Sequence, residues 1–289
     1  MIRIATRNSA LAKAQARQVA ELLGGAELVE VSSDGEPGDK GRFVRGVERA
    51  LLAGEAEVGV HSAKDVPAEM PEGLAIAAVP HREDPADVWV GAGSSLEEVP
   101  EGSRVGTASL RRRAQLLAAR PDLRVEELHG NVDTRLRKLA EGDLDGIVLA
   151  AAGLRRLGRE GEAAFAIPAE AMVPAAGQGA LVLQAREADG DSRERAAAIG
   201  DETALRELTA ERTVVALLEA TCASPIGVHA SVEGERIAVE AFVGLPDGSE
   251  WVRDRIEDDA AEPAAAGAEL AGRLAAAGAR DILAGAETP

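Results

Sequence analysis

Strand-like segments alternate with helix-like segments along most of the 289 residues, and this alternation constrains the fold more than any other feature. Residues 3–6 and 28–31 predict strands, while residues 10–23 between them place Leu11 and Val19 on one helical face. Strands that alternate with helices are typical of a mostly parallel sheet with helices on both of its faces. The sequence therefore predicts an α/β fold.

The alternation restarts along the chain, which indicates several units. After residues 80–87, a second set of strands and helices extends to residue 173. Residues 174–185 return to the first unit, the polar stretch 186–200 predicts a linker, and a long helix from residue 201 opens a third unit. The expected domains are residues 1–85 with 174–200, residues 86–173, and residues 201–289.

The charge of the chain limits the kinds of molecule that it can bind. The formal net charge of −18 disfavours nucleic acid and anionic membranes. The sequence has no apolar run long enough for a membrane span and no apolar signal segment at its start, so we expect a cytoplasmic protein. Residues 104–159 nevertheless contain 12 Lys and Arg against 7 Asp and Glu. This local excess fits an anion site or a solvated basic face equally well.

Arginines follow several predicted strands, at the positions where open α/β sheets bind ligands. Residues 106–113 comprise a strand end, a turn and a helix whose first turn carries three arginines. Arginine at a helix N-terminus opposes the helix dipole unless an anion binds there. Guanidinium groups bind carboxylates in a bidentate fork, and the chain lacks a glycine-rich phosphate loop. The pattern therefore favours a ligand with several carboxylates.

Two other residues each have two interpretations. Asp65, next to Lys64, is suited to stabilise developing positive charge, or it caps a turn before Pro67. Cys222 is the only cysteine, which excludes an internal disulfide and a cysteine-rich metal site. A buried apolar role or covalent chemistry remains for its thiol. The 4 histidines lack the spacing of metal ligands, so we expect no metal.

Nine segments, collinear along nearly the whole chain, together resemble the porphobilinogen deaminase family, also called hydroxymethylbilane synthase. They are residues 3–9, 40–44, 61–67, 106–112, 130–135, 152–158, 174–179, 202–212 and 222–227. The resemblance implies two lobes like periplasmic binding proteins around a cleft, and a smaller C-terminal α+β domain that presents the cysteine. It also implies a monomer whose dipyrromethane cofactor is joined to Cys222 through a thioether.

The resemblance further implies a transferase that condenses four molecules of the partner substrate, porphobilinogen, into linear hydroxymethylbilane with loss of ammonia. Asp65 would stabilise the cationic azafulvene formed as ammonia leaves, and Lys64 and Arg7 would complete the catalytic set. The residues implied to bind the cofactor are Cys222, Asp65, Lys64, Ser109, Arg111, Arg112, Arg135, Arg156, Thr107 and Asn131. Those implied to bind substrate are Arg7, Ser9, Lys40, Ser62, Arg135, Arg156 and Gln178.

The chain departs from the family pattern at three places. His129 stands where the family usually has arginine, the loop 32–40 is short, and Thr221 and Ala223 replace the usual glycine and glutamine beside the cysteine. Two alternatives therefore stay open. One is an anion-binding or sensing module on the same two-lobed scaffold, which needs no thiol. The other is an inactive relative of the enzyme.

Overall fold

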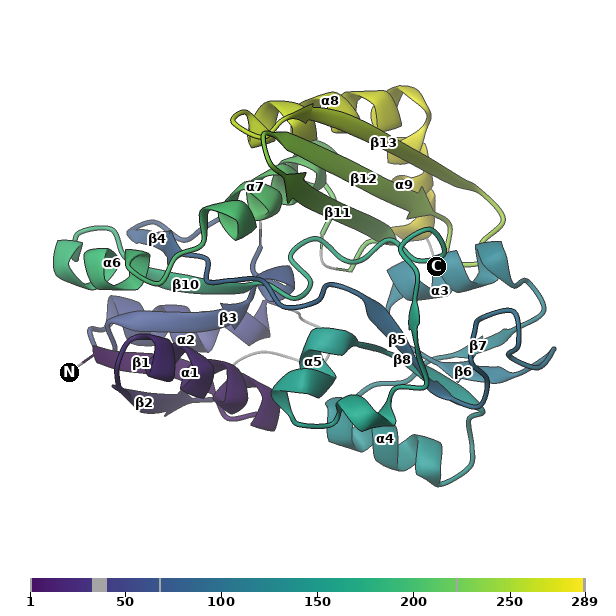
Figure 1. The fold of residues 1–289 in the computed structure, drawn as a ribbon, viewed down its shortest axis with the longest axis horizontal. Coiled ribbons are helices and arrows are strands. Elements are labelled where there is room, and N and C mark those ends of the chain that lie inside the picture. Colours follow the sequence, from purple (N-terminus) through teal and green to yellow (C-terminus); the bar gives the residue numbers. More distant parts are fainter. Residues whose placement is uncertain (1, 33–40, 68, 222, 288–289) are drawn as a thin grey trace.

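The computed structural model describes residues 2–32, 41–67, 69–221 and 223–287, and these form three sheets surrounded by helices (Figure 1). Two sheets have five strands and the third has three. The predicted architecture, two larger α/β lobes and a smaller C-terminal unit, is confirmed. Lys40 and Cys222 lie outside the described residues, so their predicted roles have no structural description here.

The first sheet has the strand order β2-β1-β3-β10-β4. Helices α1 (Ala10–Leu22) and α6 (Gly190–Ala197) pack on one face, and α2 (Arg42–Leu52) packs on the other. The predicted linker at residues 186–200 is wrong, because α6 lies there and buries Ala196 in the core of this lobe. The strands are β1 (Ile2–Arg7), β2 (Ala26–Val31), β3 (Val58–Ser62), β4 (Leu74–Ala78) and β10 (Leu181–Arg186).

The second sheet repeats this plan with the order β7-β6-β8-β5-β9. Helices α4 (Val132–Ala140) and α5 (Ala151–Arg156) pack on one face, and α3 (Leu110–Ala119) packs on the other. The sequence did not predict α5 or β9. The strands are β5 (Asp87–Gly91), β6 (Arg104–Gly106), β7 (Arg124–Glu126), β8 (Gly146–Ala150) and β9 (Phe165–Ile167).

Each of these sheets is less parallel than predicted. β1 is parallel to β2 and β3, and β6 is parallel to β7 and β8. In contrast, β10 is antiparallel to both of its neighbours, and so is β5. β5 and β10 are the strands that follow the two crossings between the lobes. A chain that enters a lobe by such a crossing lacks the helical connection that would set its strand parallel to the others.

The third unit is an antiparallel sheet with helices on one side, as Figure 1 shows at the top of the molecule. Its strands are β11 (Ile226–Glu233), β12 (Arg236–Gly244) and β13 (Trp251–Asp259), and its helices are α7 (Glu202–Leu217), α8 (Pro263–Ala276) and α9 (Ala279–Glu287). The sequence did not predict β13 or α9. Among the described residues, no helix combines the length and the apolar character needed to cross a bilayer.

The third unit packs against both lobes. Ala204 and Leu208 on α7 join the apolar cluster of the first lobe that contains Val66. On the other side, Phe242 on β12 packs against Ala114 and Val173 of the second lobe. The helix that leads to the cysteine segment is therefore fixed against the first lobe.

Candidate active site

The turn that carries Lys64 and Asp65 lies at the carboxyl end of β3, where the short helix η1 (Ala63–Asp65) begins. The Ala63 amide donates to the carbonyl of Ala180 at 3.0 Å, and the Val66 amide donates to the carbonyl of Ala63 at 3.1 Å. Gly177 packs so closely that a Cβ there would lie 2.8 Å from the Ala63 Cβ, and its φ is +72°. The segment returning from the second lobe therefore fixes this turn through a position that requires glycine.

Asp65 faces Arg7 across the edge of the first sheet. The Arg7 Nη2 and Asp65 Oδ2 atoms are 3.6 Å apart, and the two side chains keep 23% and 28% of their surface exposed. β1 and β3 are neighbouring parallel strands, so their carboxyl ends place these residues together. The ion pair is therefore partly accessible to solvent.

Arg111 and Arg112 converge on a buried carboxylate that the sequence did not single out, Asp87. The Nη1 atom of Arg111 and the Nη2 atom of Arg112 each lie 2.7 Å from an Asp87 oxygen. Although burial alone would raise the pKa of Asp87, the two guanidinium groups lower it well below its usual range. Two cations against one anion leave a formal excess of +1 in a place shielded from water.

Gln178 links this cluster to the Asp65 turn. Its side-chain nitrogen donates to Asp87 at 3.1 Å and to the Pro85 carbonyl at 2.6 Å, and its oxygen accepts from Lys64 Nζ at 3.3 Å. Burial, together with the charge of Arg112, lowers the pKa of Lys64 to about 8. These hydrogen bonds link the two lobes.

Arg135 and Arg156 extend the positive region. Burial and the nearby charge of Arg112 lower the pKa of Arg135 to about 10, so Arg135 and Arg112 lie in the same desolvated region. Arg156 Nη2 donates to the Gly179 carbonyl at 2.7 Å, and its Nε donates to Gln18 on α1 at 3.3 Å. Arg156 therefore reaches the first lobe from the second. Burial lowers the pKa of both Arg135 and Arg156, and the charge of Arg112 adds to this effect at Arg135, so an anion bound here would stabilise these cations.

The smaller polar residues of the predicted site have local partners. Three of them cap helices by accepting a backbone N–H bond: Ser9 for α1, Ser109 for α3 and Asn131 for α4. Thr107 accepts from the Ser109 amide at 3.1 Å, and Ser62 accepts from Gln15 at 2.7 Å. These contacts set the positions of the turns.

The histidines lie apart from this cluster. His129 contacts Glu127 at 2.7 Å, and both side chains are 71% exposed. His61 is buried against Gln184, and burial lowers its pKa to about 4. Within the described part of the chain, no group of His, Asp and Glu has the arrangement of a metal site.

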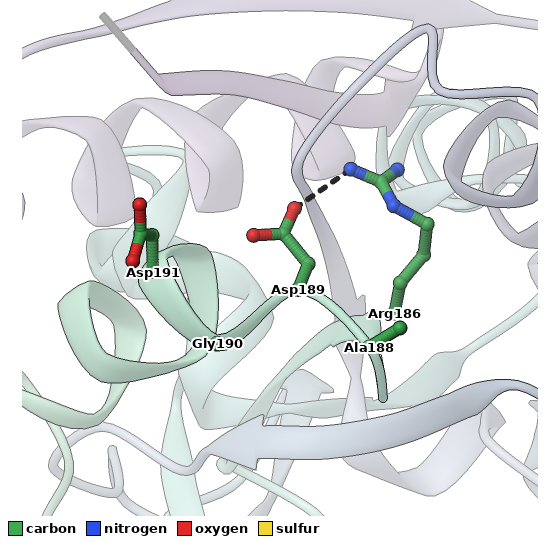
Figure 2. A pocket seen from close by; sticks show the side chains of 5 residues that line it. All are labelled: Arg186, Ala188, Asp189, Gly190 and Asp191. Carbon is green, nitrogen blue, oxygen red and sulfur yellow. Dashed lines mark hydrogen bonds and ion pairs between the residues drawn. The ribbon is translucent and has the colours of Figure 1, made fainter.

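A pocket of about 420 Å³ lies elsewhere, at the start of α6. Figure 2 shows that Arg186 and Asp189 point toward each other there; their ion pair measures 2.8 Å. Arg186 also donates to the Ala56 carbonyl at 2.8 Å. Asp189 and Asp191 both line this pocket and outnumber its single arginine, so it lacks the excess positive charge found around Asp87.

The lowered pKa of Lys64 makes the free energy of unfolding depend on pH. The unfolded chain keeps this proton up to about pH 10.4, whereas the folded chain releases it near pH 8. Between these values the unfolded state binds more protons, so the contribution of Lys64 to the free energy of unfolding rises with pH. In the folded protein, the positive charge of Lys64 and its attraction for anions are lost as the pH rises through about 8.

We predict that Lys64 in the Cys222→Ser protein is acetylated with a midpoint near pH 8. The chain contains 4 lysines, which makes competitive labelling with acetic anhydride and peptide mass spectrometry straightforward. A free alkylamine in the same tube provides the reference titration. A Lys64 midpoint that coincides with this reference would show that the turn does not desolvate the ammonium group.

Two protein-family models match this chain. The model described as "Porphobilinogen deaminase, dipyromethane cofactor binding domain" matches residues 2–194, and "Porphobilinogen deaminase, C-terminal domain" matches residues 205–276. The cationic cluster falls within the first match, and Cys222 falls within the second.

The porphobilinogen deaminase of Syntrophus aciditrophicus is 42% identical, with 98% of this chain and 97% of that protein covered. The porphobilinogen deaminase of Thiobacillus denitrificans is 43% identical, with 97% of each chain covered. Among solved structures, a Bordetella pertussis extracytoplasmic solute receptor binding pyroglutamic acid aligns with a TM-score of 0.42 and 13% identity, over 71% of this chain and 78% of that chain. By the family models and the two relatives, this chain belongs to the porphobilinogen deaminase family.

Proposed function

We propose that this protein is a hydroxymethylbilane synthase, a transferase that condenses four porphobilinogen molecules into hydroxymethylbilane with release of ammonia. The observation that carries the proposal is the convergence of Lys64, Arg111, Arg112 and Arg135 beside the Asp65 turn. Porphobilinogen carries an acetate and a propionate group. A growing pyrrole chain is therefore a polyanion, and this cluster has the charge and the geometry to hold it.

The same donor set fits dipyrromethane, which carries the same carboxylates. Lys64, Arg111, Arg112 and Arg135 would hold these groups, and Cys222 would form the thioether. When bound, dipyrromethane supplies the free α-carbon that attacks the first substrate. Asp87 keeps the Arg111 and Arg112 side chains in place, so that they need little rearrangement when the carboxylates arrive.

Asp65 has the position of a catalytic group. As the amino group leaves porphobilinogen, positive charge develops on the pyrrole and its exocyclic carbon, and a carboxylate close to the ring stabilises it. The ion pair with Arg7 restrains the Asp65 carboxylate, while the neighbouring Lys64 ammonium group donates to Gln178 at 3.3 Å. The two charges of the turn therefore have different partners in the protein.

The remaining assignments form part of the same proposal. Arg7 and Arg156 bind the incoming substrate with Lys40, while Ser9, Ser62 and Gln178 hold the turns around it. The three domains follow the ranges predicted above, and the pairing of β10 with β3 and β4 supports the assignment of residues 174–200 to the first lobe. We also propose that the protein is a cytoplasmic monomer that binds no nucleic acid.

Arg112→Lys is predicted to lower kcat/KM for porphobilinogen by about 10- to 100-fold, because the ammonium group cannot form the fork, and a charge-assisted bond contributes about 1.5–3 kcal/mol. Lysine keeps a positive charge beside Asp87, which limits the effect on folding. Arg113→Lys is the matched control, since Arg113 is the next residue on α3 and lies near Asp247 of the third unit. Equal effects of the two substitutions would contradict the assigned role of Arg112.

Incubation of the purified protein with porphobilinogen tests the function itself. Four ammonium ions should appear for each hydroxymethylbilane, measured on the same samples. Binding of porphobilinogen without ammonium release would instead support an anion-binding module. Cofactor-loaded protein that neither binds nor converts the substrate would identify an inactive relative.

A further inference from the structure

Arg212 connects the third unit to the backbone that directly follows Asp65. It lies on α7, the helix that precedes the cysteine segment. Its Nη1 donates to the carbonyl of Val66 at 3.0 Å, and its Nη2 donates to the carbonyl of Pro67 at 2.7 Å. One guanidinium group from the C-terminal unit therefore spans two consecutive carbonyls of the turn.

The turn is held at both ends, by different parts of the molecule. On its first side, Ala63 bonds to Ala180 of the returning segment. On its second side the fork of Arg212 fixes the carbonyls after Asp65, and Val66 packs in the same apolar cluster as Leu208 of α7. Guanidinium holds its paired donors in a rigid plane, whereas the three donors of an ammonium group rotate on one nitrogen at the end of a flexible stem, so lysine at position 212 would fix the two carbonyls less firmly.

We propose that Arg212 is a positioning residue for Asp65, and that it keeps the carboxylate at the place where the substrate becomes cationic. The inference rests on the proposed function, since it takes the role of Asp65 from there. It assigns to the C-terminal unit a second task besides presenting the cysteine, because α7 sets the geometry of the acid in the first lobe.

Arg212→Met is expected to lower kcat per cofactor-loaded molecule by about 10- to 100-fold, because a displacement of about 1 Å in a catalytic group has effects of this size. KM should stay within about twofold, since the carboxylate-binding arginines are untouched. Arg212→Lys should recover part of the rate. Arg206→Met is the matched control: Arg206 lies on the same helix, but its side chain pairs with Glu202 at the surface.

A double substitution separates positioning from a general structural effect. If Arg212 acts through Asp65, adding Arg212→Met to Asp65→Asn should lower kcat by less than about twofold further. A loss that multiplies fully with that of Asp65→Asn would show that Arg212 affects the reaction by another route and would overturn the proposal.

Hydrogen–deuterium exchange reports on the turn without relying on turnover. In the Arg212→Met protein, a peptide spanning residues 62–67 should exchange at least about tenfold faster, and in the Arg206→Met protein it should exchange at the parent rate. Unchanged exchange in Arg212→Met would overturn the proposal. Faster exchange in a protein whose parent converts no porphobilinogen would instead reject the proposed function while leaving the hold on the turn established.

Discussion

Asp65→Asn is expected to lower the turnover of cofactor-loaded protein by about two to four orders of magnitude, the range found for acid–base and electrostatic groups. The carboxylate is partly exposed and lies 3.6 Å from Arg7, and the turn that carries it is bonded to Ala180 and Arg212. Asparagine keeps the size and turn-forming ability of aspartate but removes the charge that a developing cation requires. Folding should therefore change little while the reaction slows.

Turnover and melting temperature, measured on one sample, test this prediction. A residue that only caps the turn would show the opposite pattern, with a lowered melting temperature and a modest loss of rate. Asp145→Asn is a suitable control. Asp145 pairs with Arg104 at 3.3 Å and lies just before β8 begins, whereas Arg156 lies on α5, after β8 ends. Near-parent turnover in Asp65→Asn would reject the catalytic role.

The parts of the site that the sequence predicts are those determined by local structure. Arg7 ends β1 and Asp65 follows β3, and parallel neighbours bring strand ends together, so their meeting follows from the alternation of strands and helices. Ser109 and Asn131 each stand just before a helix, and both accept a backbone N–H bond from its first turn. The helix caps involve residues a few positions apart, so they can be predicted from the local sequence.

Asp87 shows what the sequence leaves undetermined. Asp87 is the first residue of β5, and the next three residues are apolar and buried. A carboxylate at the start of a buried strand requires a cation or a hydrogen-bond donor as its partner. That requirement was a usable signal, but nothing in the order of residues shows that Arg111 and Arg112 provide the partner. The pairing depends on the direction of β5: because β5 runs antiparallel to β8, Asp87 lies at the carboxyl end of β8, beside the carboxyl end of β6, the strand that precedes α3.

Two elements that the sequence failed to predict, α6 and β13, also depend on contacts between distant residues. The segment of α6 is polar, with mainly Ser192 and Ala196 buried, and therefore resembles a linker in sequence. β13 is rich in charged residues, since it pairs with one neighbour in its sheet and exposes much of its length. Both elements depend on contacts with distant residues more than on their own pattern.

Cys222→Ser is predicted to abolish both cofactor attachment and turnover, the largest effect of any single substitution proposed for this chain. Serine differs from cysteine by one atom, but a hydroxyl does not form the thioether that anchors dipyrromethane. Because the chain contains no other cysteine, no second thiol can replace it. Ala223→Ser is a fitting control, since it adds a hydroxyl to the exposed neighbouring residue and keeps the thiol.

The intact mass of the purified protein tests the central claim most directly. The parent and the Ala223→Ser protein should both exceed the mass of the polypeptide by that of one dipyrromethane, and the Cys222→Ser protein should show the mass of the polypeptide alone. Addition of porphobilinogen to the parent should then raise the mass in steps of one pyrrole unit. An active parent without the excess, or a Cys222→Ser protein that retains it, would contradict the account.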